Sequence, residues 1–407
     1  PAPPIDADAS LGTVTVDELT VNGSATLQGD ITTAADQHYG GAVTAAADVI
    51  LDAGSGTVSF GSTLDGTTAD AESVTVTAST TTFSGAVGGG TRLDVLTVTN
   101  AARVDGGRID ARTQSYGSLE IGAATTLSGN SVGITGATTQ SGTHALTLDA
   151  TTASLGAVTV NQLTANGSTT LNGNVTTGGA QQYVDLELGA DTTLTASSVT
   201  VTGATTQSGT RTLTIAAATS SLGAMTVGKL TVNGTATLNG DVSTSDTQQY
   251  ANVVLGADRQ LTAAGSSDVD ITGTLTGAHG LCGDAGGTTR LRGAVNIDSL
   301  TTGTGGGTEI GGNVTTSGGQ VYGNAVTLAG DAVLTAGTDG VDFQSTVVGA
   351  YALSVNTSGQ TRFQGVVGSG TGAALTSLAT DAGGHTRLGA DLTTRRAQAY
   401  GRALPPD

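Results

Sequence analysis

The chain has 407 residues, of which 33 are acidic and 14 basic, and its net charge is −19. This balance disfavours binding to nucleic-acid phosphates or to an anionic membrane surface. Aromatic residues make up only 3 %, Trp is absent and Gly totals 64, which excludes a thick globular core of large side chains. The chain has a single cysteine, Cys282, which excludes an intrachain disulfide. It contains no apolar run of about 18 residues, the length that a membrane-spanning helix needs.

Proline marks the two ends of the chain and is missing from its interior. The five prolines are Pro1, Pro3, Pro4, Pro405 and Pro406. Proline lacks the N–H that a strand ladder uses, so its absence favours an interior in which nearly every segment is a strand. We expect a linker or assembly segment over 1–10, one continuous repeat body over 11–402 and a tail over 403–407. The chain starts without Met or an apolar leader, which favours a mature or excised piece.

A Gln-x-Tyr triplet recurs six times along the predicted repeat body. Successive tyrosines are 77, 67, 67, 72 and 78 residues apart, which indicates one structural unit stacked on copies of itself. The tyrosines of the six triplets are Tyr39, Tyr116, Tyr183, Tyr250, Tyr322 and Tyr400. We interpret them as markers of the repeat and expect each glutamine, on the same strand face, to form a stacked amide ladder or to close a corner.

A shorter period lies inside these units. Four phenylalanines, each followed by a similar phrase, lie 20 to 23 residues from an aromatic neighbour and predict a coil of about 20 residues. They are Phe60, Phe83, Phe343 and Phe363. Where adjacent coils both carry an aromatic residue, we expect the rings to stack face to face.

Each coil contains short alternating strands separated by glycine. Phrases such as Val158-Thr159-Val160 place apolar residues on one face, and Asn166-Gly167 supplies the residues that tight corners need. No amphipathic helix fits a chain so rich in glycine and β-branched residues. The predicted fold is all-β, a parallel β-helix or β-solenoid of about 20 residues per coil. We expect a right-handed coil, because parallel crossovers favour that hand.

The repeat phrases resemble those of large exported bacterial proteins. Leu171 to Tyr183 and Leu188 to Thr195 are similar to repeats of the filamentous-haemagglutinin-like and autotransporter-like β-solenoid adhesins and surface filaments. The resemblance implies secretion, a role in attachment or matrix building, and no catalysis. The N-terminal secretion domain and the C-terminal membrane barrel of such proteins are not recognisable in this chain.

Several residue patterns are candidates for catalysis or binding, and each also has a purely structural interpretation. Acidic residues recur about once per turn, at Asp48, Asp191, Asp258 and Asp331, which favours turn capping over a catalytic carboxylate cluster. Arginines of Thr-Arg-Leu or Thr-Arg-Phe phrases either bind anionic glycans or a neighbouring acidic face, or form internal salt bridges. These are Arg92, Arg290, Arg362 and Arg387.

The patterns that would indicate metal binding, histidine chemistry or ice binding give weaker signals than the acidic and arginine patterns. The Gly-Gly-x-Gly-x-Asp loop that binds calcium between coils is absent, and His279 with Cys282 is a lone pair. Single threonines between apolar residues indicate inside–outside alternation rather than an ice-binding array. We therefore predict no catalytic, cofactor-binding or metal-binding residues and no cofactor.

These observations predict a secreted, non-enzymatic structural protein of the cell surface or extracellular matrix. In one form it assembles head to tail with copies of itself into a filament. In the other it is a stalk or passenger segment of a large adhesin, continued by further repeats and attached to cells, surfaces or a host or matrix glycan. We expect no nucleic-acid partner and no membrane insertion.

Overall fold

A computed structural model describes residues 3–369 and 373–401. The chain divides into two compact units, Pro1–Val201 and Thr202–Asp407. The described residues form an all-β parallel solenoid of about 20 turns, with about 19 residues per turn and no helix. This confirms the predicted fold, and the turn of about 19 residues is close to the predicted coil of about 20. The predicted tail at 403–407 lies outside the described residues.

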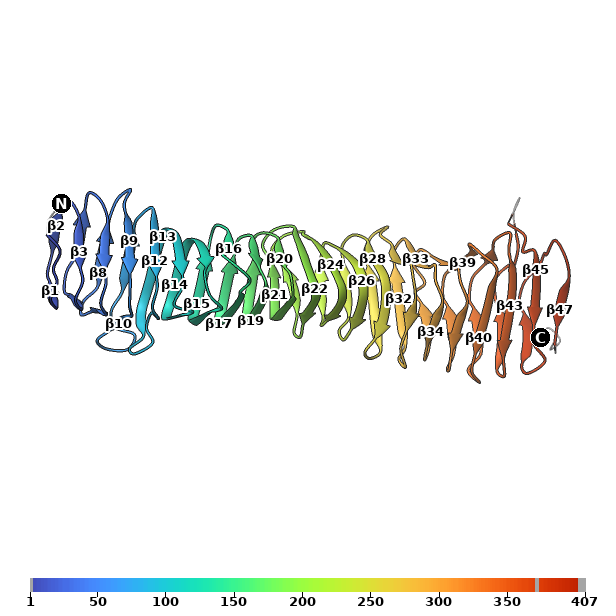
Figure 1. Cartoon of the computed structure of the whole chain (residues 1–407). Helices are drawn as coiled ribbons and strands as arrows, with labels where there is room; N and C mark the ends of the chain where they lie inside the picture. Colours follow the sequence, from blue (N-terminus) through green and yellow to red (C-terminus); the bar gives the residue numbers. More distant parts are fainter. Residues whose placement is uncertain (1–2, 370–372, 402–407) are drawn as a thin grey trace. The chain divides into compact units, whose positions relative to one another are not determined.

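Strands follow one another around each turn of unit 1 (Figure 1). Its strands are β1 (Ala9–Leu11), β2 (Val14–Val16), β3 (Leu19–Val21), β4 (Ala25–Leu27), β5 (Ile31–Thr33), β6 (Gln37–Tyr39), β7 (Val43–Ala45), β8 (Val49–Asp52), β9 (Thr57–Phe60), β10 (Leu64–Gly66), β11 (Val74–Thr77), β12 (Thr80–Phe83), β13 (Leu93–Val104), β14 (Arg108–Ile121), β15 (Thr125–Ile134), β16 (Thr138–Gln140), β17 (Ala145–Leu155), β18 (Val158–Val160), β19 (Gln162–Leu171), β20 (Val175–Thr177), β21 (Ala180–Leu188) and β22 (Thr192–Val201).

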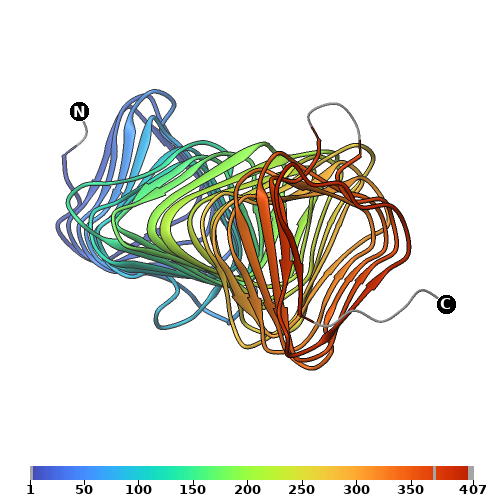
Figure 2. The same cartoon turned by 90° about the vertical axis from the view of Figure 1, so that its right-hand side faces the viewer.

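Unit 2 is built in the same way, and its successive turns follow a similar path when viewed along the coils (Figure 2). Its strands are β23 (Thr205–Gln207), β24 (Thr212–Leu222), β25 (Met225–Val227), β26 (Lys229–Leu238), β27 (Val242–Thr244), β28 (Gln248–Leu255), β29 (Arg259–Ala263), β30 (Val269–Ile271), β31 (Leu275–Thr276), β32 (Leu281–Ala285), β33 (Thr288–Leu291), β34 (Val295–Ile297), β35 (Leu300–Thr302), β36 (Gly307–Ile310), β37 (Val314–Thr316), β38 (Gln320–Tyr322), β39 (Ala325–Leu328), β40 (Ala332–Ala336), β41 (Val341–Phe343), β42 (Val347–Val348), β43 (Ala352–Thr357), β44 (Gln360–Phe363), β45 (Ser377–Thr380), β46 (His385–Leu388) and β47 (Gln398–Tyr400).

Each strand pairs in parallel with the strand one turn later, so the strands form stacks. In unit 1 one stack runs through β3, β6, β9 and β12, with Val21, Tyr39, Phe60 and Phe83 in register. The longer strands bend around a corner and belong to two stacks. In β13, one half pairs with β11 and the other half with β12.

The core is narrow because only alternate residues of each strand point inward. In β18, Val158 and Val160 are buried and Thr159 is exposed, which is the alternation that the sequence predicts. Parallel in-register pairing then puts like residues above one another, as with Leu155, Leu171 and Leu188. The core is therefore a set of aliphatic columns that run from turn to turn.

Two columns are aromatic. Tyr39, Phe60 and Phe83 stack in unit 1, with ring centroids 5.4 and 5.3 Å apart and interplanar angles of 12° and 4°. Tyr322, Phe343 and Phe363 stack in unit 2 with centroids 5.0 and 4.9 Å apart. All six side chains are buried. The predicted face-to-face stacking is confirmed, and it arises because parallel register leaves one ring directly above the next.

The segment predicted as a linker or assembly segment, 1–10, contains part of the first described turn. Ile5 forms an isolated bridge with Val21, and β1 pairs with β4. Pro1 and Ala2 lie outside the described residues. An assembly role for this segment stays a prediction.

We predict that Phe60→Ala lowers the free energy of unfolding by about 3–5 kcal/mol, because it opens a cavity in the middle of an aromatic column. The matched control is Ile50→Ala, since Ile50 is a large apolar residue of the same unit that is 48 % exposed. Its effect should stay within about 0.5 kcal/mol. Urea unfolding followed by far-UV circular dichroism measures both, and equal effects of the two substitutions would contradict a packed aromatic column.

Candidate functional site

The Gln-x-Tyr triplet forms a buried hydrogen-bonded clamp at a corner of the coil. In the first copy, the Tyr39 hydroxyl donates to Gln37 Oε1 over 3.1 Å. The Gln37 amide nitrogen donates to the Ile31 carbonyl, 3.2 Å away on the preceding strand, and to the Asp52 carbonyl, 3.0 Å away on the next turn. Both side chains are fully buried. One side chain therefore ties together two strands of one turn and the turn that follows.

The same clamp recurs with little change in four further copies. The Tyr-to-Gln hydrogen bond is 2.9 to 3.1 Å long at Gln114, Gln181, Gln248 and Gln320, and each of these amides donates to backbone carbonyls. The amide nitrogens contact carbonyls rather than other glutamines, so the triplet closes a corner and forms no amide ladder. In the sixth copy, Tyr400 contacts Gln398 over 2.9 Å, but Gln398 is exposed.

The triplets of one unit lie on different stacks. In unit 1, one stack of residues in register consists of Tyr39, Phe60, Phe83, Val104 and Ile121. Tyr116 lies earlier in the same strand as Ile121 and belongs to the neighbouring stack. Tyr183 in turn precedes Leu188, which shares the stack of Tyr116. Four turns span 82 residues from Tyr39 to Ile121 and 72 residues from Tyr116 to Leu188. The triplet steps of 77 and 67 residues both fall short of four turns, so the sequence repeat moves around the coil.

A second glutamine clamp closes other corners and was missed by sequence reasoning. Gln140 Oε1 accepts hydrogen bonds from the backbone N–H groups of His144 and Asn161, at 2.7 and 2.9 Å. Gln207 Oε1 accepts from Arg211 and Gly228, both at 2.7 Å. The sequence contains a signal for this second clamp, because the phrase Thr135–Thr143, which includes Gln140, returns unchanged as Thr202–Thr210, which includes Gln207.

The recurring aspartates cap corners, as the sequence predicts. The carboxylates of Asp48, Asp258 and Asp331 each accept a hydrogen bond of 2.8 Å from a backbone N–H one turn later. Asp191 lies directly before β22. A carboxylate that accepts backbone N–H groups stabilises a corner without any bound cation.

One buried carboxylate orders a longer corner loop between β10 and β11. Glu72 is 7 % exposed and accepts hydrogen bonds from the Thr67 hydroxyl and from the backbone N–H groups of Thr67 and Thr68. The Thr67 hydroxyl and these N–H groups hold the pKa of Glu72 below its usual range. All described hydrogen-bond partners of the Glu72 carboxylate belong to its own loop, so this carboxylate serves the fold.

Two arginines of the predicted row, Arg92 and Arg290, form ion pairs with acids on neighbouring turns or loops. Arg92 donates to Asp70 over 2.6 Å, and Arg290 forms ion pairs with Asp268 and, over 3.6 Å, with Glu309. Internal salt bridges thus account for these two. Arg362 forms no ion pair with any residue in the described part of the chain, and it lies in register with Arg387 on the next turn.

The histidines and the cysteine do not assemble a reactive group. His38 contacts the Ser59 hydroxyl over 2.8 Å, and His279 Nδ1 lies 3.8 Å from Asp258. Cys282 is partly buried, and burial together with the nearby Asp284 raises the pKa of its thiol, which leaves it a weak nucleophile. Over residues 3–369 and 373–401, no group of three or more His, Cys, Asp or Glu side chains is placed to hold a metal ion.

Comparison of the chain with protein-family models, with curated proteins and with solved structures finds no match. No helix of the described residues is long and apolar enough to cross a membrane. The buried side chains that recur from repeat to repeat hold corners and columns of the solenoid. The surfaces left for binding are the outer side chains of the turns and the strand edges that no described strand covers.

We predict that the clamp is energetically coupled. In Gln248→Leu, the buried Tyr250 hydroxyl and the Val242 and Thr262 carbonyls lose their partners, and the free energy of unfolding should fall by about 2–4 kcal/mol. Tyr250→Phe removes one donor and should cost about 1 kcal/mol. The double variant should be more stable than the sum of the two effects predicts, because Gln248→Leu no longer strands a hydroxyl. Strict additivity in denaturant unfolding would argue against a shared clamp.

We predict a loss of stability at high pH that is tied to the buried phenols. Burial raises the pKa of Tyr39, Tyr116, Tyr183, Tyr250 and Tyr322 above its ordinary value, which is about 10 in an unfolded chain. Their contribution to stability is complete below pH of about 10 and is lost as the pH rises above it, since only the unfolded chain ionises there. The phenolate absorbance of these five tyrosines should appear together with the loss of β circular dichroism. Ionisation of more than two of the seven tyrosines in a chain that keeps its β signal would contradict buried phenols.

Proposed function

We propose that this chain is a secreted, non-enzymatic structural protein whose solenoid adds to copies of itself, turn upon turn, to build an extracellular filament or matrix. The observation that carries the proposal is the uniform parallel pairing of the turns. Every stack repeats one ladder, so the edge of a turn is complementary to the edge of another turn in the same orientation. Repetition of one such contact in one direction gives an open-ended fibre.

Strand edges in both units are suited to this contact. Among the described strands, β2 pairs with β5 alone and β46 with β44 alone. Such an edge presents unpaired N–H and C=O groups and is a template for pairing with another chain. The resemblance of the repeat phrases to exported adhesins and surface filaments supports a location outside the cell.

The alternative is a stalk or passenger segment of a large adhesin, in which further turns of the same polypeptide cover these edges. The same uniform register favours it, because a solenoid extends by adding turns. A longer stalk would carry a separate tip that contacts cells, surfaces or glycans. The two proposals differ in what the chain does when it is alone in solution.

We predict that a purified polypeptide of these 407 residues forms fibres whose amount rises with protein concentration, seen by negative-stain electron microscopy and light scattering. Persistent single particles at every concentration would overturn self-assembly and favour the stalk. Fibres made of side-by-side particles, without continuation of the turns, would also contradict the proposed contact.

A substitution on the edge of β2 tests the contact directly. The Val14 N–H donates to the Asp30 carbonyl on the β5 side, so the N–H of Thr15 points to the other edge, where no described strand pairs with β2. Thr15→Pro removes this N–H and should block fibre growth. Thr15→Ala keeps the N–H and is the matched control, which should assemble like the native chain.

A further inference from the structure

The sixth Gln-x-Tyr triplet differs from the other five because no described turn follows it. It forms β47, which pairs with β45 alone among the described strands. Gln398 is exposed and Tyr400 is partly exposed, whereas both side chains are buried in each of the five earlier copies. The same pair of residues therefore occurs in two settings, with a following turn and without one.

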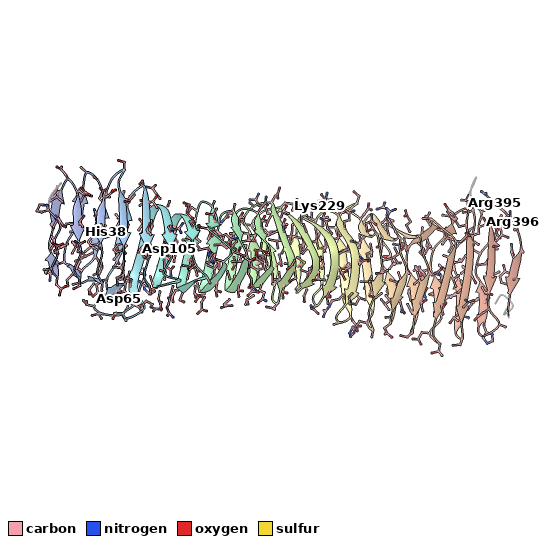
Figure 3. All side chains as sticks on the ribbon, in the orientation of Figure 1. His38, Asp65, Asp105, Lys229, Arg395 and Arg396 are labelled. Carbon is pink, nitrogen blue, oxygen red and sulfur yellow. The ribbon has the colours of Figure 1, made fainter. Side chains whose placement is uncertain are left out.

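The half of the clamp that belongs to its own turn is already formed in the sixth copy. The Tyr400 hydroxyl donates to Gln398 Oε1 over 2.9 Å, as in the other copies. At the corner before β47, where Figure 3 labels Arg396, the Thr394 hydroxyl donates to the Arg396 carbonyl over 2.8 Å. The Thr316 hydroxyl makes the equivalent contact before the fifth copy, over 3.0 Å. The Gln398 side chain and its corner are thus held as in a complete clamp.

In the complete clamps the next turn supplies the other half. The Gln320 amide donates to the Thr335 carbonyl over 2.9 Å, and the Tyr322 carbonyl accepts from the Gln344 N–H over 3.0 Å. The first copy receives the same two bonds from its next turn, at 3.0 and 2.8 Å. In all five copies the glutamine amide binds a carbonyl of the next turn. The structure that completes a clamp is therefore a parallel turn of this same chain.

Both of these groups are unused in the sixth copy. The Gln398 amide nitrogen has no hydrogen-bond partner among the described residues, and no described N–H donates to the Tyr400 carbonyl. The Ala397 carbonyl and the Gly401 N–H bond to the β45 side. Alternate residues of a parallel strand face opposite sides, so the backbone groups of Gln398 and Tyr400 face the open edge. A side-chain donor and a backbone acceptor are thus in place for one further turn.

We propose that the Gln398–Tyr400 site binds the first turn of a second copy, and that the Gln398 amide donates to a backbone carbonyl of that turn. This inference rests on the proposed self-assembly and names the contact that joins one copy to the next. The contact between copies repeats the contact between turns, and the second copy buries the clamp as the next turn does in the interior.

The first described turn has carbonyls that suit this donor. The N–H groups of Ala9 in β1 and Val14 in β2 donate toward β4 and β5. By the same alternation, the carbonyls of Ser10 and Thr15 face the opposite edge, where no described strand pairs with β1 or β2. This edge therefore presents acceptors in the orientation that the open edge of β47 requires.

Gln398→Leu tests the donor in the full-length chain. Because Gln398 is exposed, the substitution should leave the thermal unfolding midpoint of the unassembled chain unchanged, unlike Gln248→Leu in the interior. It should raise the protein concentration needed for fibres by about tenfold or more, since a carbonyl at the contact between copies loses its donor. Gln360→Leu is the matched control, because Gln360 is an exposed glutamine of β44 outside the triplets. It should assemble like the native chain.

Nitration of tyrosines by tetranitromethane, located by peptide mass spectrometry, reports the same contact without a substitution. In the unassembled chain Tyr351 and Tyr400 should react, because Tyr351 is 39 % exposed and Tyr400 is partly exposed. In fibres Tyr400 should be protected, as the buried Tyr322 is in both states, and Tyr351 should still react.

The outcomes separate this inference from the proposed function. A native chain that forms no fibres overturns self-assembly and this contact together. Fibres of Gln398→Leu at native concentrations, or a Tyr400 that reacts equally in fibres, overturn the contact and leave self-assembly standing. Equal loss of assembly in Gln398→Leu and Gln360→Leu has the same meaning. A Tyr400 already protected in the unassembled chain, or a lowered unfolding midpoint of Gln398→Leu, would show that the chain itself covers the site.

Discussion

The whole structure depends on one constraint: each turn must return the chain to a position directly above its previous turn, in parallel register. Strands of three or four residues make too few hydrogen bonds to impose this alone, so the corners must be held as firmly as the strands. The clamp of Gln37 and Tyr39 does so by joining Ile31 and Asp52 across two turns. Once a corner is set, alternation and register give the columns of the core.

The clamp occurs on different stacks, so its control over the register of the turns is distributed around the coil. Tyr39, Tyr116 and Tyr183 lie on three different stacks of unit 1. A repeat of a whole number of turns would leave two of every three corners without a clamp and would stack identical phrases directly above one another. Identical neighbouring strands specify register weakly, because a slip by one turn costs little. The offset between repeat and turn therefore makes each register distinguishable from its neighbours.

The fold could be predicted from the sequence because its signals are local and repeated. The alternation in Val158-Thr159-Val160 indicates which residues point inward, and the spacing of Phe60 and Phe83 indicates the length of one coil. The partner of a glutamine is not local in this sense. Gln37 binds a carbonyl 15 residues later, and that distance follows from where the corner places Asp52. Likewise, the four Thr-Arg phrases look alike in sequence, and only the register shows acids beside Arg290 but a second arginine beside Arg362.

Glutamine, tyrosine and several aspartates are engaged in the corners of the turns. A solenoid can vary its outer residues at little cost to the core, since outward positions contact mainly the same positions of neighbouring turns. At such positions a pairing of opposite charges is the stable default, as Asp270, Arg290 and Glu309 illustrate.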